Sequence, residues 1–245
     1  MVLMEFIIEF ALVISLSVIL SIVAFAFRFL TLGGAIASLI IGIIVGAFGG
    51  FEWFILLMIF VMTGFAATRV SFLKKKAAGL QEGVSGERTH MNILGVGIPP
   101  CIFAVLAYFA GDEHALIMTI GFIASISVAA ADTVASEIGV KDQNVWLCTT
   151  FKHVPPGTNG GISVLGTIVA LAAAFATSLL GWLVLYQELH LYLLIPTIAG
   201  FIGCYLDSIL GATLEDHGYI SKYTNNAATG VMGALIAMTI AFFFI

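Results

Sequence analysis

Long apolar segments separated by short polar loops make up almost the whole chain. A helix needs about 20 largely apolar residues to cross the hydrocarbon of a bilayer. Segments that approach or exceed this length run over residues 5–27, 32–50, 52–68, 93–110, 115–137, 162–186, 191–213 and 228–245. The pattern predicts an all-α, polytopic membrane bundle of about eight transmembrane helices, with residues 1–245 forming a single integral membrane domain.

Basic residues are confined to alternate loops. All nine Lys and Arg residues follow the first, third, fifth or seventh segment, and the opposite loops carry only acidic charges. The positive-inside rule therefore predicts a multi-pass cell-membrane protein with both termini outside and the basic loops in the cytoplasm. The second and third segments are short, but a re-entrant hairpin there would remove two segments together and keep the remaining loops on the same sides.

Composition excludes several other classes of protein. The chain is 61% hydrophobic and 9% charged, which excludes an ordinary soluble domain. Its net charge of -5, without a basic stripe outside the short loops, indicates no nucleic-acid partner. Its three cysteines lack a C-x-x-C pairing and indicate neither a zinc site nor a disulfide framework. The first segment exceeds a signal-peptide core and carries Glu5 and Glu9, which favours a retained span. The lipid bilayer is the expected environment, and a homo-oligomer is compatible with the sequence.

The fifth and seventh segments each carry an aspartate near their predicted cytoplasmic ends. Asp132 lies about 17 residues into its helix, roughly 25 Å along it, and Asp207 lies at a matching depth. Ionisable residues within a span are costly and are functional candidates. Two carboxylates at equal depth can share Mg²⁺ with substrate phosphate oxygens. The alternative is an interfacial Asp132 that caps a helix or pairs with a lysine, with Gly211 beside Asp207 serving helix packing only.

A Pro-rich and Gly-rich stretch, residues 152–163, leads into the sixth segment. Such a loop at a helix N-terminus exposes backbone amides that can hold an anion, and Lys152 adds a positive charge. The spacing matches neither the P-loop nor the dinucleotide fingerprint. An ordinary turn with a helix cap is the alternative. Before the fourth segment, Arg88, His90 and Asn92 add a cationic and amide cluster on the same face.

Three motifs carry a resemblance to a known family: Asp132-Thr-x-Ala-Ser-Glu-x-Gly139, Gly157-Thr-x-Gly-Gly-x-Ser-x-x-Gly166 and Asp207-Ser-x-x-Gly-Ala212. Together they resemble the phytyl-phosphate kinase family, which also includes transmembrane protein 19, and the resemblance spans nearly the whole chain. It implies a polytopic kinase that moves the terminal phosphate of a nucleoside triphosphate, often CTP or UTP, onto an isoprenoid monophosphate such as phytyl or geranylgeranyl phosphate. The loop is also similar in kind to that of phosphatidate cytidylyltransferases and dolichol kinases.

Residue chemistry and resemblance together define the candidate site. Phosphoryl transfer needs positioning and charge neutralisation, and an anionic phosphate acceptor needs no strong general base. We expect Mg²⁺ on Asp132, Glu137 and Asp207, nucleotide phosphates on Lys152 and the amides of residues 157–161, and the lipid phosphate on Arg88. The candidate catalytic residues are Asp132, Lys152 and Asp207. Further candidates for substrate binding are His90, Asn92, Ser136, His153, Gly157, Thr158, Asn159, Gly160, Gly161, Ser163 and Ser208.

Two other functions fit parts of this pattern. A CTP-dependent lipid cytidylyltransferase uses the same groups but attacks the α-phosphate and releases diphosphate. A transporter of small solutes or lipids would also carry intramembrane aspartates, together with helices broken at Pro99-Pro100 and Pro196. Against transport, the carboxylates gather at one face and not at the midplane of the membrane.

Overall fold

Eight long helices account for most of the computed structural model, which describes residues 2–77, 79 and 86–245. They are α1 (Val2–Ala26), α2 (Leu32–Gly49), α3 (Phe51–Ala77), α4 (His90–Ala110), α5 (Ala115–Ile138), α6 (Val164–Tyr186), α7 (Leu194–Leu210) and α8 (Lys222–Phe244). Within the described residues, all eight are long and apolar enough to cross a membrane. The predicted polytopic helix bundle is confirmed.

Hydroxyl side chains begin several of these helices. The oxygens of Thr31, Ser163 and Ser221 each accept a hydrogen bond from the amide three residues on, at 3.0–3.1 Å, and so satisfy amides that have no partner inside the helix. Ser221 explains why α8 begins at Lys222, before the predicted boundary at residue 228. The polar residues Asn225 and Asn226 belong to the first turns of this helix, but they lie outside its apolar run, from which the span was predicted.

The prolines do not break the helices. Helix α4 is continuous through Pro99 and Pro100, which are both buried. A Cβ atom at Gly230 of α8 would lie 2.7 Å from Pro99 Cγ, so a residue without a side chain accommodates the ring. Pro196 lies in the first turn of α7, where a missing amide removes no helical hydrogen bond. The predicted interruptions are therefore wrong, and they no longer support a transporter.

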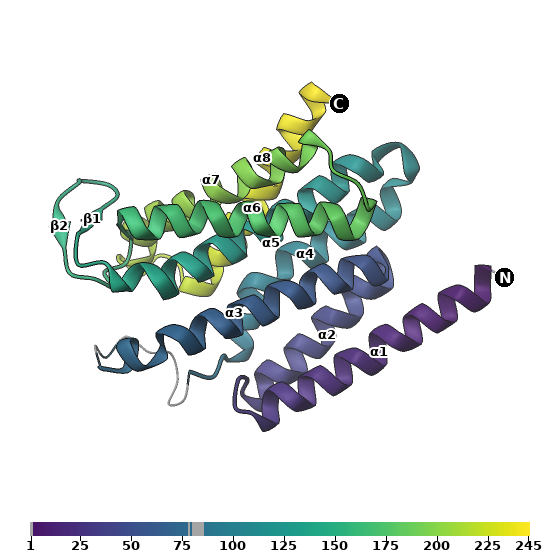
Figure 1. Cartoon of the computed structure of the whole chain (residues 1–245), viewed down its shortest axis with the longest axis horizontal. Helices are drawn as coiled ribbons and strands as arrows, with labels where there is room; N and C mark the ends of the chain where they lie inside the picture. Colours follow the sequence, from purple (N-terminus) through teal and green to yellow (C-terminus); the bar gives the residue numbers. More distant parts are fainter. Residues whose placement is uncertain (1, 78, 80–85) are drawn as a thin grey trace.

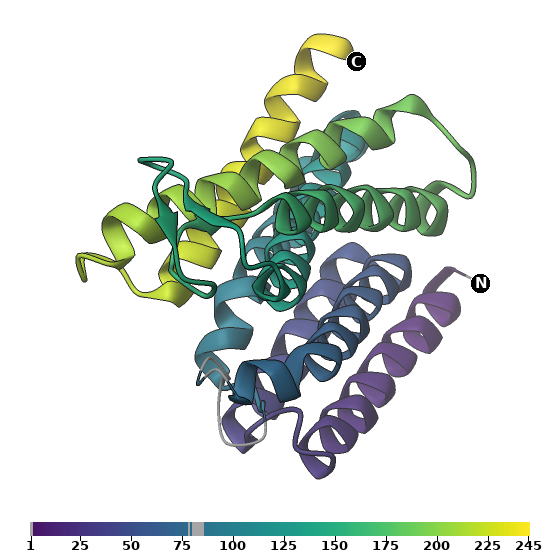
Figure 2. The same ribbon diagram turned by 60° about the vertical axis from the view of Figure 1, so that its left-hand side comes forward.

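Helix α5 forms the centre of the bundle and packs against α3, α4, α6, α7 and α8. In its most apolar stretch 72% of the residues are buried. Glycines allow the close approach: Cβ atoms at Gly203 and Gly233 would each lie 2.4 Å from Val128 Cγ2. Helix α1 lies at the outside of the bundle, next to α2 (Figures 1 and 2).

A small antiparallel sheet was not predicted. It consists of β1 (Val145–Leu147), β2 (His153–Val154) and β3 (Gly161–Ile162) in the order β2-β1-β3. Strands of two or three residues are too short to show the period of two from which a strand is recognised. The sheet connects α5 to α6 at one end of the bundle, whereas both chain termini lie at the other end (Figure 1).

Three single-turn helices and one π-helical turn complete the described chain. The 3-10 turns are Asp112–His114, Gly139–Lys141 and Leu191–Leu193, and the π-helical turn Gly211–Glu215, called η4, continues α7. The ends of α3, α5 and α7 and the starts of α4, α6 and α8 lie at the same end of the bundle as the sheet (Figures 1 and 2). The assignment of this end of the bundle to the cytoplasm stays a prediction from the positions of the basic residues.

Candidate active site

A polar cavity of about 530 Å³ opens at the sheet end of the bundle, and we call it the ionic cavity. This volume is in the range of small-molecule sites, roughly 300–1,000 Å³. Helices α3 to α8 and the loop before α6 all contribute to its walls. Its charged lining residues are Lys75, Arg88, Asp132, Glu137, Asp207, Glu215, Asp216 and Lys222.

Asp132 of α5 and Asp207 of α7 both line this cavity and repel each other electrostatically. The hydroxyl of Thr229 in α8 donates to Asp207 Oδ2 at 3.1 Å. A divalent cation between two such carboxylates would relieve their repulsion. Two carboxylates with substrate phosphate oxygens are also the ligand set that Mg²⁺ favours, so these residues fit the ion.

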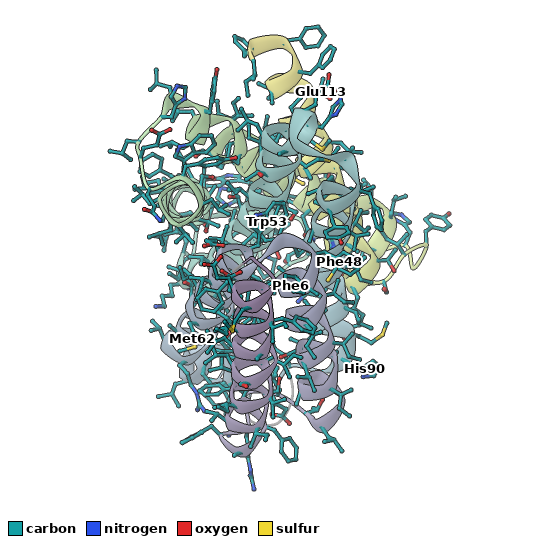
Figure 3. The ribbon with its side chains drawn as sticks, turned by 90° about the vertical axis from the view of Figure 1, so that its right-hand side faces the viewer. Phe6, Phe48, Trp53, Met62, His90 and Glu113 are labelled. Atoms are coloured by element: carbon teal, nitrogen blue, oxygen red, sulfur yellow. The ribbon has the colours of Figure 1, made fainter. Side chains whose placement is uncertain are left out.

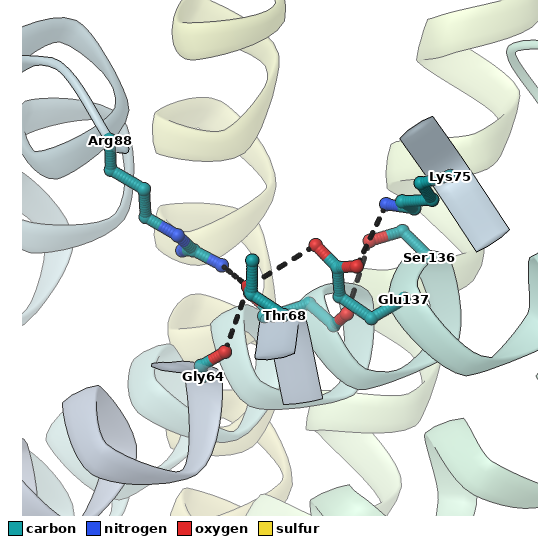
Figure 4. A network of polar contacts seen from close by, with 7 residues as sticks. Gly64, Thr68, Lys75, Arg88, Ser136 and Glu137 are labelled. Atoms are coloured by element: carbon teal, nitrogen blue, oxygen red, sulfur yellow. Dashed lines mark hydrogen bonds and ion pairs between the residues drawn. The ribbon is translucent and has the colours of Figure 1, made fainter. Parts of the chain in front are cut away.

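Glu137 is not assembled with the two aspartates. Among the described residues, no three His, Cys, Asp or Glu side chains form a group that could hold a metal ion. Glu137 Oε2 instead pairs with Lys75 Nζ at 3.0 Å, and its Oε1 lies 3.3 Å from the Thr68 hydroxyl (Figure 4). The physical reason is that α3 continues to Ala77, well beyond the predicted end at residue 68, and so places Lys75 over α5. The structure therefore does not group Glu137 with Asp132 and Asp207, and its role as a metal ligand stays a prediction.

Arg88 lies across Thr68 and Glu137 from Lys75 (Figure 4). Its Nη2 donates to Thr68 Oγ1 at 3.3 Å, and the guanidinium and Lys75 approach Thr68 and Glu137 from two sides (Figure 4). Its backbone is held by the chain before α2, because Arg88 N donates to Phe29 O at 2.9 Å and Thr31 N donates to Arg88 O at 3.1 Å. A cation at a fixed position in a polar cavity suits recognition of a phosphate.

The loop before α6 is packed onto the end of α7. Asn159 Nδ2 donates to Gly211 O and to Asp216 Oδ1, both at 3.1 Å. Gly160 has φ of +70°, and a Cβ atom there would lie 2.4 Å from Ala212 Cβ. These contacts hold residues 157–161 against η4 and along the ionic cavity.

Only some of the loop amides are available to a ligand. The amides of Thr158 and Gly161 donate within the loop, to Pro155 O at 3.2 Å and to Thr158 O at 3.0 Å. In the part of the chain that the structure describes, the amides of Gly157, Asn159 and Gly160 donate to no backbone carbonyl. The expected anion cradle is thus narrower than the whole run of five residues.

The π-helical turn η4 begins at Gly211, one helical turn after Asp207. Turns of this kind occur frequently at functional sites. Asn225 of α8 is completely buried, and its Nδ2 donates to Asp207 O at 3.1 Å and to Glu215 Oε2 at 3.3 Å. Helix α8 therefore fixes both the aspartate and the turn through Asn225 and Thr229. The one sequence signal that Asn225 and Thr229 act together is their spacing, because positions four apart share a helix face.

The remaining predicted residues separate into two groups. Asn92, Ser136, Ser163 and Ser208 line the ionic cavity, and each also bonds to its own helix or helix end. Lys152, His153 and His90 do not line it and are exposed.

The positions of these three residues follow from the local fold. His153 is the first residue of β2 and Lys152 precedes it, on the opposite edge of the sheet from β3. The His153 ring packs on Trp146, with ring centroids 4.9 Å apart. His90 lies on the outside of the bundle (Figure 3), where its Nδ1 would be 3.3 Å from a Cβ atom at Gly33. The structure therefore does not bring these three residues into the ionic cavity. Lys75 and Lys222 provide cations there instead, and sequence reasoning missed both.

Outside the membrane-spanning segments, Asp142 orders the entry to α6. Hydrogen bonds to its carboxylate, first from the Asn144 amide and then from the Leu165 amide, lower the pKa of Asp142. The Leu165 amide lies in the first turn of α6, where a negative charge is favourable. The carboxylate therefore stays ionised and fixes the start of the helix beside the loop.

Eight described helices that are long enough to cross a membrane, with the ionic cavity at one end of their bundle, define a polytopic membrane protein with a polar site near its helix ends. The chain belongs to the family described as integral membrane protein DUF92, which matches residues 15–244. No solved structure matches it.

Several relatives cover most of the chain. It is 38% identical over 218 residues to the uncharacterized membrane protein MJ0933 of Methanocaldococcus jannaschii, covering 87% of this chain and 88% of that protein. It is 30% identical to Protein VTE6, chloroplastic, of Arabidopsis thaliana, covering 86% of this chain and 64% of the relative. It is also 30% identical to Protein PGR of Arabidopsis thaliana, with coverages of 84% and 78%.

Proposed function

We propose that this protein is a membrane kinase that transfers the terminal phosphate of a nucleoside triphosphate, CTP or UTP, to an isoprenoid monophosphate. The observation that carries the proposal is the convergence of Asp132, Asp207, Arg88 and the loop 157–161 on one cavity. The motif resemblance to phytyl-phosphate kinases and the relationship to Protein VTE6 support the same activity.

The cavity supplies the groups that this transfer needs. Mg²⁺ held by Asp132 and Asp207 would neutralise charge on the phosphates. Lys222 and the amides of Gly157, Asn159 and Gly160 would hold the nucleotide phosphates, and Arg88 would orient the acceptor phosphate. An anionic oxygen of the acceptor then attacks the γ-phosphorus. The bond from that phosphorus to the β–γ bridging oxygen breaks, and the nucleoside diphosphate leaves with the electron pair.

The test is transfer from CTP labelled at the γ-phosphate to geranylgeranyl phosphate by purified protein in Mg²⁺. We expect the label in the lipid diphosphate. Asp132→Asn and Asp207→Asn should each lower the rate by about 100-fold or more, because each removes a charge on which the phosphates depend while preserving volume. Glu113→Gln, at the terminal end of the bundle (Figure 3), is the matched control and should keep full activity.

Other outcomes separate the alternatives. Release of labelled diphosphate with cytidylate on the lipid would identify a cytidylyltransferase. Full activity in either aspartate variant would reject that carboxylate as a ligand. No product from CTP, UTP or ATP with any prenyl phosphate would overturn the proposed function.

A further inference from the structure

We infer that the first isoprene unit of the acceptor binds in a second, apolar cavity between α2, α3 and α4. We call this cavity the apolar groove. The inference rests on the proposed function and names the place in the bundle that recognises the lipid. It follows from the way in which this groove meets the ionic cavity at Arg88.

The apolar groove has a volume of about 50 Å³. Its walls include Ile41 of α2, Leu57, Met58 and Val61 of α3, and Ile93 of α4. Arg88 is the one charged residue among the described residues that line it. A chain segment inside the groove therefore contacts mainly apolar side chains, with a single cation at one end.

Arg88 and Val96 line both cavities. The Arg88 backbone is fixed by its hydrogen bonds to Phe29 and Thr31, and its guanidinium points to Thr68 at the border of the ionic cavity. A molecule whose phosphate pairs with Arg88 from the ionic side has the apolar groove directly on the other side of that residue. An isoprenoid monophosphate has this arrangement of a charged head on an apolar chain.

Gly64 of α3 keeps the junction open. It lines the apolar groove, and a Cβ atom there would lie 3.9 Å from Arg88 Nη2 and 3.7 Å from Thr133 Cγ2. These are ordinary contact distances, so the backbone of α3 leaves space beside the guanidinium. A larger side chain at this position would narrow the passage from the phosphate to the groove.

The size of the groove sets how much of the lipid it holds. At about 50 Å³ the groove is far smaller than the roughly 300–1,000 Å³ of a site that holds a whole small molecule, so it holds only a short part of the lipid, the isoprene unit next to the phosphate. The rest of a longer chain then continues toward the bilayer. The groove therefore recognises the unit next to the phosphate and leaves total chain length weakly selected.

The first test uses photo-crosslinking without any nucleotide, so that its result does not depend on transfer. A geranyl phosphate that carries a photoreactive group on its first isoprene unit should label peptides of α2, α3 or α4 at the groove. Excess geranylgeranyl phosphate should compete with this labelling. Labelling confined to other helices would overturn the inference.

The second test fills the groove. Val61→Phe should raise the KM for prenyl phosphates about 10-fold or more and leave the KM for CTP within about 2-fold, because the new ring takes the space of the isoprene unit. Gly64→Ala, which meets only ordinary contacts, should give a smaller change in the same direction. Met62→Phe is the control, because Met62 is 62% exposed and lies on the outside of α3 (Figure 3).

The outcomes distinguish the two hypotheses. Crosslinking in the groove without transfer from any nucleoside triphosphate would reject the proposed kinase but keep the groove. Normal transfer with an unchanged KM for prenyl phosphates in both Val61→Phe and Gly64→Ala would reject the groove but keep the kinase. If Val61→Phe does not fold, Gly64→Ala and the crosslinking decide the question.

Discussion

At the scale of single residues, the cations of the ionic cavity determine how it can hold phosphate. Lys75 is committed to Glu137 through an ion pair of 3.0 Å. Lys222, at the start of α8, lines the cavity and interacts electrostatically with Asp207. Lys152, the lysine favoured by the sequence, is exposed and lies outside the cavity. Lys222 is therefore the lysine we expect to contact the nucleotide.

This assignment predicts a clear difference between two lysine substitutions. Lys222→Gln should lower kcat/KM for CTP by about 100-fold, because a fixed cation near developing phosphate charge is worth several kcal/mol. Lys152→Gln should stay within about 2-fold of the unsubstituted protein. The measurement is steady-state transfer over a range of CTP concentrations. Equal losses in both variants would return Lys152 to the site.

At the scale of elements, the loop 157–161 and the π-helical turn η4 form one unit. Asn159 joins them through Gly211 and Asp216, and Gly160 brings their backbones close together. The importance of Gly160 thus has two parts, its positive φ of +70° and the contact with Ala212. A side chain at this position would be strained by the positive φ and would collide with Ala212.

A matched pair of substitutions separates these two parts. Gly160→Ala and Gly218→Ala both place a side chain at positive φ, at +70° and +74°, but nothing lies within 4 Å of a Cβ atom at Gly218. Both should lose about 1–2 kcal/mol of stability from backbone strain. Only Gly160→Ala should also lose most of its transfer activity, because the loop is pushed off α7. Thermal unfolding and transfer rate are the measurements, and equal activity in both variants would contradict the packing argument.

At the scale of the whole molecule, the bundle has two different ends. The sheet and the ionic cavity lie at one end, and both termini lie at the other (Figure 1). The 3-10 turn Asp112–His114 connects α4 to α5 at the terminal end. The distribution of Lys and Arg predicts that the cavity end faces the cytoplasm, where nucleoside triphosphates are available.

Single reporter cysteines test this orientation in a chain whose three native cysteines are replaced. Glu113→Cys should react with a membrane-impermeant thiol reagent added to intact cells, whereas Gly79→Cys and Lys152→Cys should react only after the membrane is opened. The reason is that all basic charge lies in alternate loops. Reaction of Gly79→Cys and Lys152→Cys from opposite sides would contradict a shared cavity face.

The sequence by itself determined the eight membrane-spanning helices and their order along the chain. Hydrocarbon offers no partner for backbone groups, so each apolar run of sufficient length must become a helix. Charge is costly inside it, so Asp132 and Asp207 were recognisable as functional candidates from their depth alone. Helix caps such as Ser163 and Ser221 are also set by residues close in the sequence. The start of α8 was nevertheless placed too late, because its first turns are polar.

Only the tertiary structure decided which side chains meet. The ion pair between Lys75 and Glu137 depends on how far α3 extends past its apolar run. The exclusion of Lys152 depends on the strand order of a sheet too short to be recognised. The position of Lys222 in the ionic cavity and the hydrogen bond from Thr229 to Asp207 depend on the packing of α8 against α7. The junction of the two cavities at Arg88 depends on Gly64 of α3. These are contacts between residues distant in the chain, and they arise from helix rotation and packing, which a hydrophobic pattern along one segment does not specify.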